Sequence, residues 1–151
     1  MLSQMEQIAV AYRVWEKLIV GSLARTSMGV DLEVDPRSST MTTPDADVAL
    51  ALGEALAGSG EVVPHPTQDQ WKGKFLPFFQ AAGVRSLKAF MADATNVEIK
   101  RSDGQLELMP YRNLGPKDGF EPISSDKVVL PAEDLIGAVT VLRALLDPNG
   151  S

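Results

Sequence analysis

Residues 96–112, NVEIKRSDGQLELMPYR, predict a β-hairpin. Asp103-Gly104 is a dipeptide typical of two-residue hairpin turns, because both residues of such a turn adopt positive φ. Apolar residues stand at alternating positions on each side of the turn, as in strands with one buried face: Val97, Ile99, Leu106 and Leu108. The two strands of a hairpin are antiparallel, so this stretch predicts an antiparallel sheet.

Two amphipathic helices are predicted, one on each side of the hairpin. The first follows Thr43, a good N-cap, and Pro44, which suits the first helical position; it ends at GSG, 58–60. The second starts near Pro131, after a strand at 126–130, and ends at PNG, 148–150. Each has an apolar face, formed by Val48, Leu52, Ala55 and Leu56 in the first helix and by Leu135, Val139, Leu142 and Leu146 in the second.

The N-terminal segment fits two patterns. A helical stripe would contain Met5, Ile8, Tyr12 and Trp15, whereas one face of a strand would contain Tyr12, Val14, Leu18 and Val20. Because β-branched and aromatic residues are dense here, we favour a strand from 12 to 23. TSMG, 26–29, then forms a turn into VDLEVD, 30–35, which predicts an antiparallel pair.

Aromatic residues are concentrated in WKGKFLPFFQAAG, 71–83, which Pro77 interrupts. We expect a short helix or an irregular segment that covers the sheet, followed by a short amphipathic segment at 85–94. Trp15 and Trp71 are expected in the core or at its rim. The order of elements predicts a single domain, 1–151, of the α+β (mixed α/β) class, with a mainly antiparallel sheet and helices packed on it.

The composition is that of a soluble globular protein, with 44% apolar and 23% charged residues among 151. The absence of cysteine from the sequence excludes disulfides, thiolate metal sites and cysteine nucleophiles. The first residues, MLSQMEQIAVAYR, lack a basic region followed by an unbroken apolar stretch. We therefore expect no signal peptide, no membrane span and a cytoplasmic location.

Negative charge is concentrated in one segment. The net charge of −6 argues against nucleic acid as a direct ligand. Residues 31–61 contain seven acids and one base, so this segment alone carries a charge equal to that of the whole chain. Asp45 and Asp47 lie in it, in the first turn of the predicted first helix, where they complement the helix dipole.

The stretch VDLEVD opens this acidic segment. In an extended strand, Asp31, Glu33 and Asp35 would share one face, and the apolar residues between them would share the other: Val30, Leu32 and Val34. Like charges at this spacing repel one another. The stripe is therefore either a solvated surface or a docking surface for a basic partner.

The sequence contains few residues suited to catalysis. His65 is the only histidine and lies between two prolines, where an ordinary surface residue is typical. No GxSxG, GxGxxG or GxxxxGK[ST] motif occurs in the sequence. Asp31, Glu33 and Asp35 could offer oxygen ligands to a metal ion, but same-face side chains of a strand are about 7 Å apart, too far for one ion. We predict no catalytic residue, metal ion or cofactor; a small carboxylate-based hydrolase, with or without a metal ion, is the alternative.

Two helical stretches, PDADVALALGEAL (44–56) and PAEDLIGAVTVLRAL (131–145), resemble each other. Each begins with proline and acids and contains an aliphatic residue followed by glycine, Leu52-Gly53 and Ile136-Gly137, where glycine predicts close packing on the sheet. This double pattern, with an aromatic segment and a hairpin between its halves, resembles the immunity proteins of bacterial contact-dependent growth inhibition systems. The resemblance covers residues 40–147, although the second helix continues as VTVLRALL and not as an alanine-leucine repeat.

The resemblance implies a cytoplasmic antidote that binds the C-terminal toxin domain of its own system's exported effector and blocks it without catalysis. The toxins of such systems are commonly nucleases, whose surfaces are basic, and an acidic partner associates with them rapidly through electrostatic steering. The family does not assign binding residues by position. The predicted toxin-binding residues therefore rest on charge: Asp31, Glu33 and Asp35, with Asp45 and Asp47 as neighbours in sequence.

Overall fold

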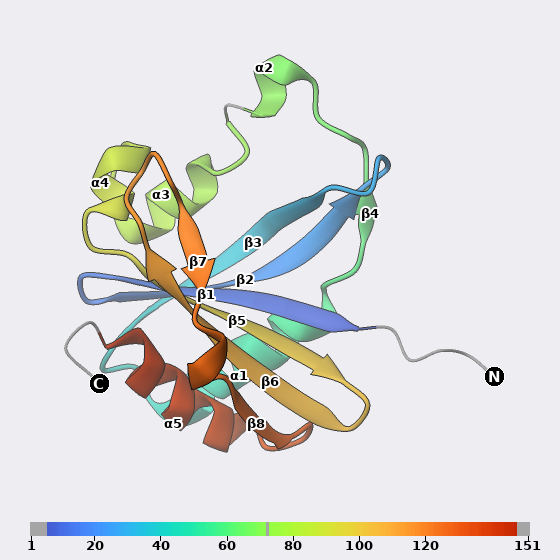
Figure 1. Ribbon diagram of the computed structural model, residues 1–151, viewed down its shortest axis with the longest axis vertical. Coiled ribbons are helices and arrows are strands. Elements are labelled where there is room, and N and C mark those ends of the chain that lie inside the picture. The colour runs from blue at the N-terminus through green and yellow to red at the C-terminus, as the bar shows by residue number, and fades with distance from the viewer. Residues whose placement is uncertain (1–5, 72, 148–151) are drawn as a thin grey trace.

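The computed structural model describes residues 6–71 and 73–147, and these residues form one sheet flanked by helices (Figure 1). The strand order is β3-β2-β1-β5-β6-β7, with β4 paired to β2 and β8 paired to β6. Only the β2–β4 pair is parallel among the described strands. The α+β prediction is confirmed. The strands are β1 (Gln7–Val14), β2 (Lys17–Thr26), β3 (Asp31–Thr40), β4 (Val62–Val63), β5 (Thr95–Ser102), β6 (Gln105–Asn113), β7 (Phe120–Pro122) and β8 (Val128–Pro131).

The helices lie on both faces of the sheet. They are α1 (Asp45–Ala57), α2 (Gln68–Trp71), α3 (Leu76–Ala82), α4 (Leu87–Met91) and α5 (Leu135–Leu146), with a 3-10 turn, η1 (Ser124–Asp126). We call the face covered by α1 and α5 the helical face. The opposite face, which α3 and α4 cover at one end, is called the aromatic face (Figure 1). Within the described part of the chain, no helix is both long and apolar enough to span a membrane.

The predicted hairpin at 96–112 is confirmed. It consists of β5 and β6, and Ser102 pairs with Gln105 across the turn. Asp103 and Gly104 have φ of 52° and 77°, as a two-residue turn of this kind requires. Val97, Ile99, Leu106 and Leu108 are fully buried on the helical face. Since β5 pairs with β1 and β6 pairs with both β7 and β8, the hairpin lies at the middle of the sheet.

The helical face holds the larger aliphatic core. The apolar stripes predicted for the two helices contribute their fully buried members to this core: Leu52, Ala55, Leu56, Val139, Leu142 and Leu146. Val48 is 1% exposed, and Leu135 is packed against the cluster at its margin. Each fully buried aliphatic side chain contributes about 1.5–3 kcal/mol by leaving water, so this face accounts for much of the folding free energy.

The single strand predicted from 12 to 23 is wrong, because the segment forms two strands. Trp15 and Glu16 make a tight turn between β1 and β2, and Val14 pairs with Lys17. Trp15 has φ of 55° and is 60% exposed, so it is not a core residue as predicted. The turn lacks the glycine, asparagine or aspartate that usually marks such a position, and apolar residues continue on both sides. The sequence therefore contained no local signal for it.

Both long helices begin later than predicted. Pro44 is the N-cap of α1, and the Thr43 hydroxyl accepts a hydrogen bond from the Thr40 amide (3.0 Å), which tightens the turn before the helix. Pro131 ends β8, and Asp134 caps α5 by accepting a hydrogen bond from the Gly137 amide (3.0 Å). The predicted stop signal at 148–150, like Met5, lies outside the described residues.

The two mid-helix glycines do not pack on the sheet as predicted. A Cβ at Gly53 would lie 3.1 Å from Cδ1 of Leu135, so this glycine lets α1 approach α5. A Cβ at Gly137 would lie 2.2 Å from the Asp134 carboxylate, so this glycine leaves room for the cap of its own helix. The similar sequence patterns therefore have different structural reasons.

The aromatic segment forms a short helix, α3, and irregular chain over the sheet, as predicted. Pro77 lies in the first turn of α3, where its missing N–H costs no hydrogen bond. Ser86 caps α4 by accepting a hydrogen bond from the Ala89 amide (3.1 Å). Phe78 and Phe90 are fully buried against the aromatic face. Gly21 of β2 permits this contact, because a Cβ there would lie 2.7 Å from the Phe78 ring.

Candidate functional site

The stretch VDLEVD is only partly the regular strand that its pattern predicts. β3 begins at Asp31, and Asp31 and Glu33 pair with Arg25 and Leu23 of β2, which places both acids on the aromatic face. Asp35 has φ of 55°, and the β2–β3 register shifts at this point, so the strand contains a bulge. The acidic stripe therefore comprises Asp31 and Glu33, and the alternation ends at Asp35.

Asp45 and Asp47 do not join this stripe. They lie in the first turn of α1, which packs on the helical face and begins after the C-terminal end of β3. The ten residues of β3 span roughly 30 Å, so the two pairs of acids lie near opposite ends of that strand as well as on opposite faces of the sheet.

Asp45 has a structural partner. Its carboxylate accepts a hydrogen bond from Nε of Arg143 at 3.0 Å. The same guanidinium donates hydrogen bonds to the carbonyl oxygens of Met41 and Thr43. Arg143 thus ties α5 to the chain that leads into α1, and Asp45 supports this contact. Asp47 is exposed at the surface of α1.

Glu33 makes the most unusual contact in the stripe. Its Oε1 accepts a hydrogen bond from the hydroxyl of Tyr12 in β1, two strands away. Burial raises the pKa of Glu33 from 4.5 to about 7; the hydrogen bond from Tyr12 opposes this rise, and the negative charge of Glu98 adds to it. Burial and the adjacent Glu33 carboxylate raise the pKa of Tyr12 well above its ordinary value. A carboxyl group that titrates near neutrality in a hollow is typical of functional sites.

An aromatic hollow of about 230 Å³ opens over this pair. Six of the residues that line it are Tyr12, Glu33, Phe75, Phe90, Met91 and Phe120. The ring of Tyr12 is in contact with those of Phe75, Phe90 and Phe120, at centroid distances of 5.9, 5.2 and 5.8 Å. Glu33 also lines a second hollow of about 510 Å³, beside Asp35 and Pro36. The carboxyl group therefore stands where two concave surfaces meet.

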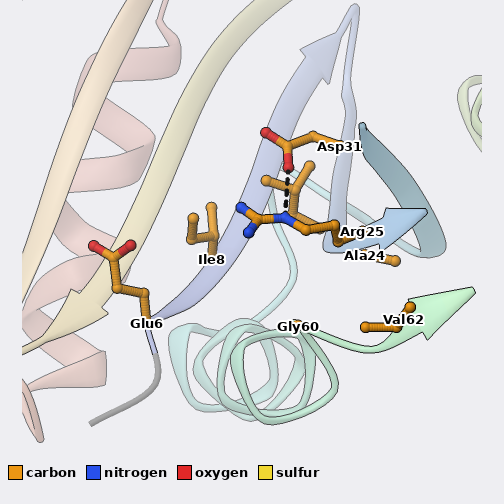
Figure 2. A pocket seen from close by; sticks show the side chains of 8 residues that line it. Glu6, Ile8, Ala24, Arg25, Asp31, Gly60 and Val62 are labelled. Carbon is orange, nitrogen blue, oxygen red and sulfur yellow. Dashed lines mark ion pairs between the residues drawn. The ribbon is translucent and has the colours of Figure 1, made fainter. Parts of the chain in front are cut away.

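Asp31 lies at the edge of a third hollow, of about 320 Å³, near the N-terminal end of β1 (Figure 2). Arg25 extends toward Asp31, and Nε lies 3.7 Å from Oδ1. Glu6 lies on the other side of Ile8 in the same hollow (Figure 2). Both members of the Arg25–Asp31 pair are more than half exposed, so the pair contributes little to stability.

The acidic stripe continues across the sheet through β5 and β6. Glu98 lies on the aromatic face, opposite Val10; burial raises its pKa, and the negative charge of Asp31 adds to that effect. Lys100 forms ion pairs with Glu6 (3.5 Å) and Glu107 (3.2 Å). We call this part of the aromatic face, beyond α3 and α4, the open end; its charged residues are Glu6, Arg25, Asp31, Glu98, Lys100, Glu107 and Lys127. The sequence alone does not identify Tyr12 and Glu98 as members of this site, because only strand pairing brings them near Glu33 and Asp31.

His65 and Trp71 have structural neighbours. The ring of His65 shares a hydrogen bond of 2.9 Å between Nδ1 and the hydroxyl of Thr26, and it contacts the ring of Trp71 at 5.5 Å. The Thr26 hydroxyl also accepts hydrogen bonds from the amides of Met28 and Val30, which close the predicted turn at 26–29. Among residues 6–71 and 73–147, no group of three His, Asp or Glu side chains is placed to hold a metal ion.

The fold has counterparts among solved structures. A protein of unknown function from Neisseria meningitidis matches with a TM-score of 0.74 and 14% identity, over 97% of this chain and 96% of that one. A chain of the CdiA-CT/CdiI toxin and immunity complex from Yersinia pseudotuberculosis matches with a TM-score of 0.70 and 15% identity, over 93% and 98%. No family model and no curated protein sequence matches. At these identities the two matches establish a shared fold.

Proposed function

We propose that this chain is an immunity protein that binds the C-terminal toxin domain of a contact-dependent growth inhibition effector and neutralises it without catalysis in the cytoplasm. The observation that carries the proposal is the match, over nearly the whole chain, to the fold found in a toxin–immunity complex. The helix pattern of 44–56 and 131–145, on which the resemblance to such immunity proteins rests, lies in α1 and in the β8–α5 region of that fold.

The toxin surface would be basic, as in a nuclease. Asp31 and Glu33 lie on the aromatic face, and Glu98 extends their negative charge toward the middle of the sheet. Asp35, at the bulge beside them, is exposed. We therefore place the toxin on this face. Asp45 and Asp47 lie on the helical side. We keep them as predicted toxin contacts, which requires a toxin large enough to extend around the end of β3.

The first experiment asks whether the adjacent upstream gene encodes a toxin domain and whether that domain co-purifies with this chain. A one-to-one complex that abolishes toxin activity is expected. Changing Asp31, Glu33 and Asp35 together to lysine should slow association at least tenfold at low salt, and less at high salt, because steering is screened. The matched control changes three exposed acids elsewhere to lysine, Asp69, Asp118 and Glu133. Equal rates for both triple variants would place the toxin elsewhere.

A carboxylate-based hydrolase is the second candidate, and one observation favours it. A pKa near 7 would suit Glu33 to general acid–base catalysis at neutral pH. Calorimetric titration with Mg²⁺, Ca²⁺ and Mn²⁺ tests its metal-dependent form: saturable binding that the change of Asp31 and Glu33 to their amides abolishes would favour the enzyme. Neutralisation of the toxin by Glu33→Gln, even at a higher concentration than the wild type needs, would favour the immunity protein, because a catalytic Glu33 could not be replaced by an amide.

A further inference from the structure

The aromatic hollow contains a carboxyl group that the fold does not require. The rings of Tyr12, Phe75, Phe90 and Phe120 line the hollow, and the side chain of Glu33, which also lines it, extends from β3 to the hydroxyl of Tyr12. A neutral side chain of the same length could accept the hydrogen bond from Tyr12 without the cost of burying a charge. The cross-strand neighbour of Glu33 is Leu23, which offers no charge.

No cation of the described residues compensates Glu33. Within residues 6–71 and 73–147, its side chain has one hydrogen bond, from Tyr12 to Oε1, and no ion pair with lysine or arginine. The negative charge of Glu98 adds to the rise in the pKa of Glu33. Oε2 has no hydrogen-bond partner in the described part of the chain, whereas every fully buried side-chain oxygen there has one, so Oε2 is not fully buried.

The hollow has the size and lining for one long cationic side chain. Its volume of about 230 Å³ corresponds to the liquid volume of about eight water molecules, at ~30 Å³ each. Aromatic rings attract cations through their π-electrons, and a guanidinium group stacks on rings and forms paired hydrogen bonds with a carboxylate. The exposed apolar side chain of Leu87 at the rim of the hollow could cover the aliphatic part of such a side chain.

We propose that this hollow is a binding pocket for an arginine side chain of the protein partner, with the Glu33 carboxylate as its counter-ion and Tyr12 as the group that orients that carboxylate. The partner is the toxin domain of the proposed function, and in this respect the inference rests on that function. The net charge of −6 is complementary to a basic partner. Arginine is favoured over lysine because the pocket offers rings as well as a carboxylate.

The pocket can be tested without the toxin. The probe is propylguanidinium, and its uncharged control is propylurea, which has nearly the same shape. We expect propylguanidinium to bind saturably, to perturb the NMR signals of the rings of Tyr12 and Phe120, and to lower the pKa of Glu33. Propylurea should bind at least tenfold more weakly. Equal binding of the two probes, or signals perturbed only elsewhere, would overturn the proposal.

Glu33→Gln is the decisive variant, because it keeps the size of the side chain and an acceptor for Tyr12. It should remove the preference for propylguanidinium, whereas Glu61→Gln, which makes the same change at an exposed residue, should retain it. Tyr12→Phe should still prefer propylguanidinium, because the carboxylate is present. The preference should be weaker, because the group that orients the carboxylate is gone. Circular dichroism of each variant checks folding. Loss of the preference in Glu61→Gln would show a nonspecific effect of charge and overturn the assignment.

Binding experiments with the toxin distinguish a failure of the proposed pocket from a failure of the proposed function. If the toxin binds, Glu33→Gln should raise its dissociation rate at least tenfold, and an arginine-to-lysine change in the toxin should lose affinity for the wild type but not for Glu33→Gln. An unchanged dissociation rate would overturn the pocket while the immunity function stands. Failure to neutralise any toxin, combined with selective binding of propylguanidinium, would overturn the proposed function and leave the guanidinium pocket in place.

Discussion

The two faces of the sheet differ in how they are covered. On the helical face, α1 and α5 bury aliphatic side chains such as Leu52 and Leu142 completely. On the aromatic face, α3 and α4 cover only one end, a carboxyl group stands beside the buried rings, and charged residues line the open end. The helical face holds the larger core and accounts for much of the stability. The aromatic face retains charged groups that lower the stability of the fold. Such groups indicate where a binding function lies.

The largest effect is expected from a cavity on the helical face. Leu142→Ala should lower the free energy of unfolding by about 2–5 kcal/mol, because the side chain is fully buried between α5 and the sheet. Urea denaturation measures this change. The matched control is Leu87→Ala on the aromatic side, where the side chain is 46% exposed and the loss should stay below about 1 kcal/mol. Equal losses would remove the distinction between the two faces.

The contact between the aromatic layer and the sheet is tested by Gly21→Ala. The added Cβ would lie 2.7 Å from Cζ of Phe78 and 3.1 Å from the carbonyl oxygen of Val34. Because Phe78 is fully buried, we expect a loss of about 1–3 kcal/mol in thermal or urea unfolding. Gly73→Ala is the control, since its Cβ would lie 3.9 Å from the carbonyl oxygen of Gln70, an ordinary van der Waals distance. A neutral Gly21→Ala would mean that the ring layer repacks easily.

The charge on the aromatic face should make stability depend on pH. The folded-state pKa of Glu33 is about 7, above the ordinary 4.5, so its stabilising contribution is complete below about pH 4.5 and is lost as the pH rises through 7. Glu33→Gln should therefore be more stable than the wild type at pH 8, by about 1–3 kcal/mol, and nearly equal to it at pH 5. Unfolding curves at both pH values measure this. Tyr12 and Glu98 are the titratable groups that act on Glu33.

A pH-independent difference between wild type and Glu33→Gln would contradict the raised pKa. Glu98 also has a raised pKa, and it contributes to the pH dependence of both proteins. The difference between the two unfolding profiles, rather than either profile alone, therefore reports on Glu33. Addition of propylguanidinium at pH 8 should reduce the difference, because a bound cation stabilises the charged carboxylate.

The smallest effect is expected where two similar acids differ only in their partner. Asp45→Asn should cost about 0.5–1 kcal/mol, because the ion pair with Arg143 is partly exposed. Asp47→Asn removes the same charge from the same helical turn and should change stability by less than about 0.5 kcal/mol. Thermal unfolding compares the two variants. If both cost the same, the helix dipole and not the Arg143 contact determines the effect.

Local sequence patterns were sufficient where one element carries its own signal. Asp103-Gly104 predicts its turn because few other dipeptides adopt two positive φ angles without strain. The stripes of α1 and α5 predict their buried faces because helical periodicity requires one apolar side. The turn at Trp15 could not be predicted, since its positive φ is imposed by the pairing of β1 with β2 and not by the residue.

The candidate site was only partly visible in the sequence. Asp31 and Glu33 are recognisable as acids that share one side of a strand. Their neighbours Tyr12 and Glu98 come from strands far away in the chain, and no spacing rule connects them. The sequence also grouped Asp45 with the stripe because it is near in number, whereas the chain turns at the end of β3 and carries it to the opposite face.

The sequence by itself determined the fold class, the central hairpin, the two long helices and the concentration of negative charge. These depend on residue type and short-range periodicity, which act within one or two turns of chain. Only the tertiary structure decided that VDLEVD is interrupted at Asp35, that Asp31 and Glu33 have different surroundings, and that Glu33 lies among aromatic rings. The physical reason is that burial and charge interactions depend on distances through space, which strand order sets and local sequence does not.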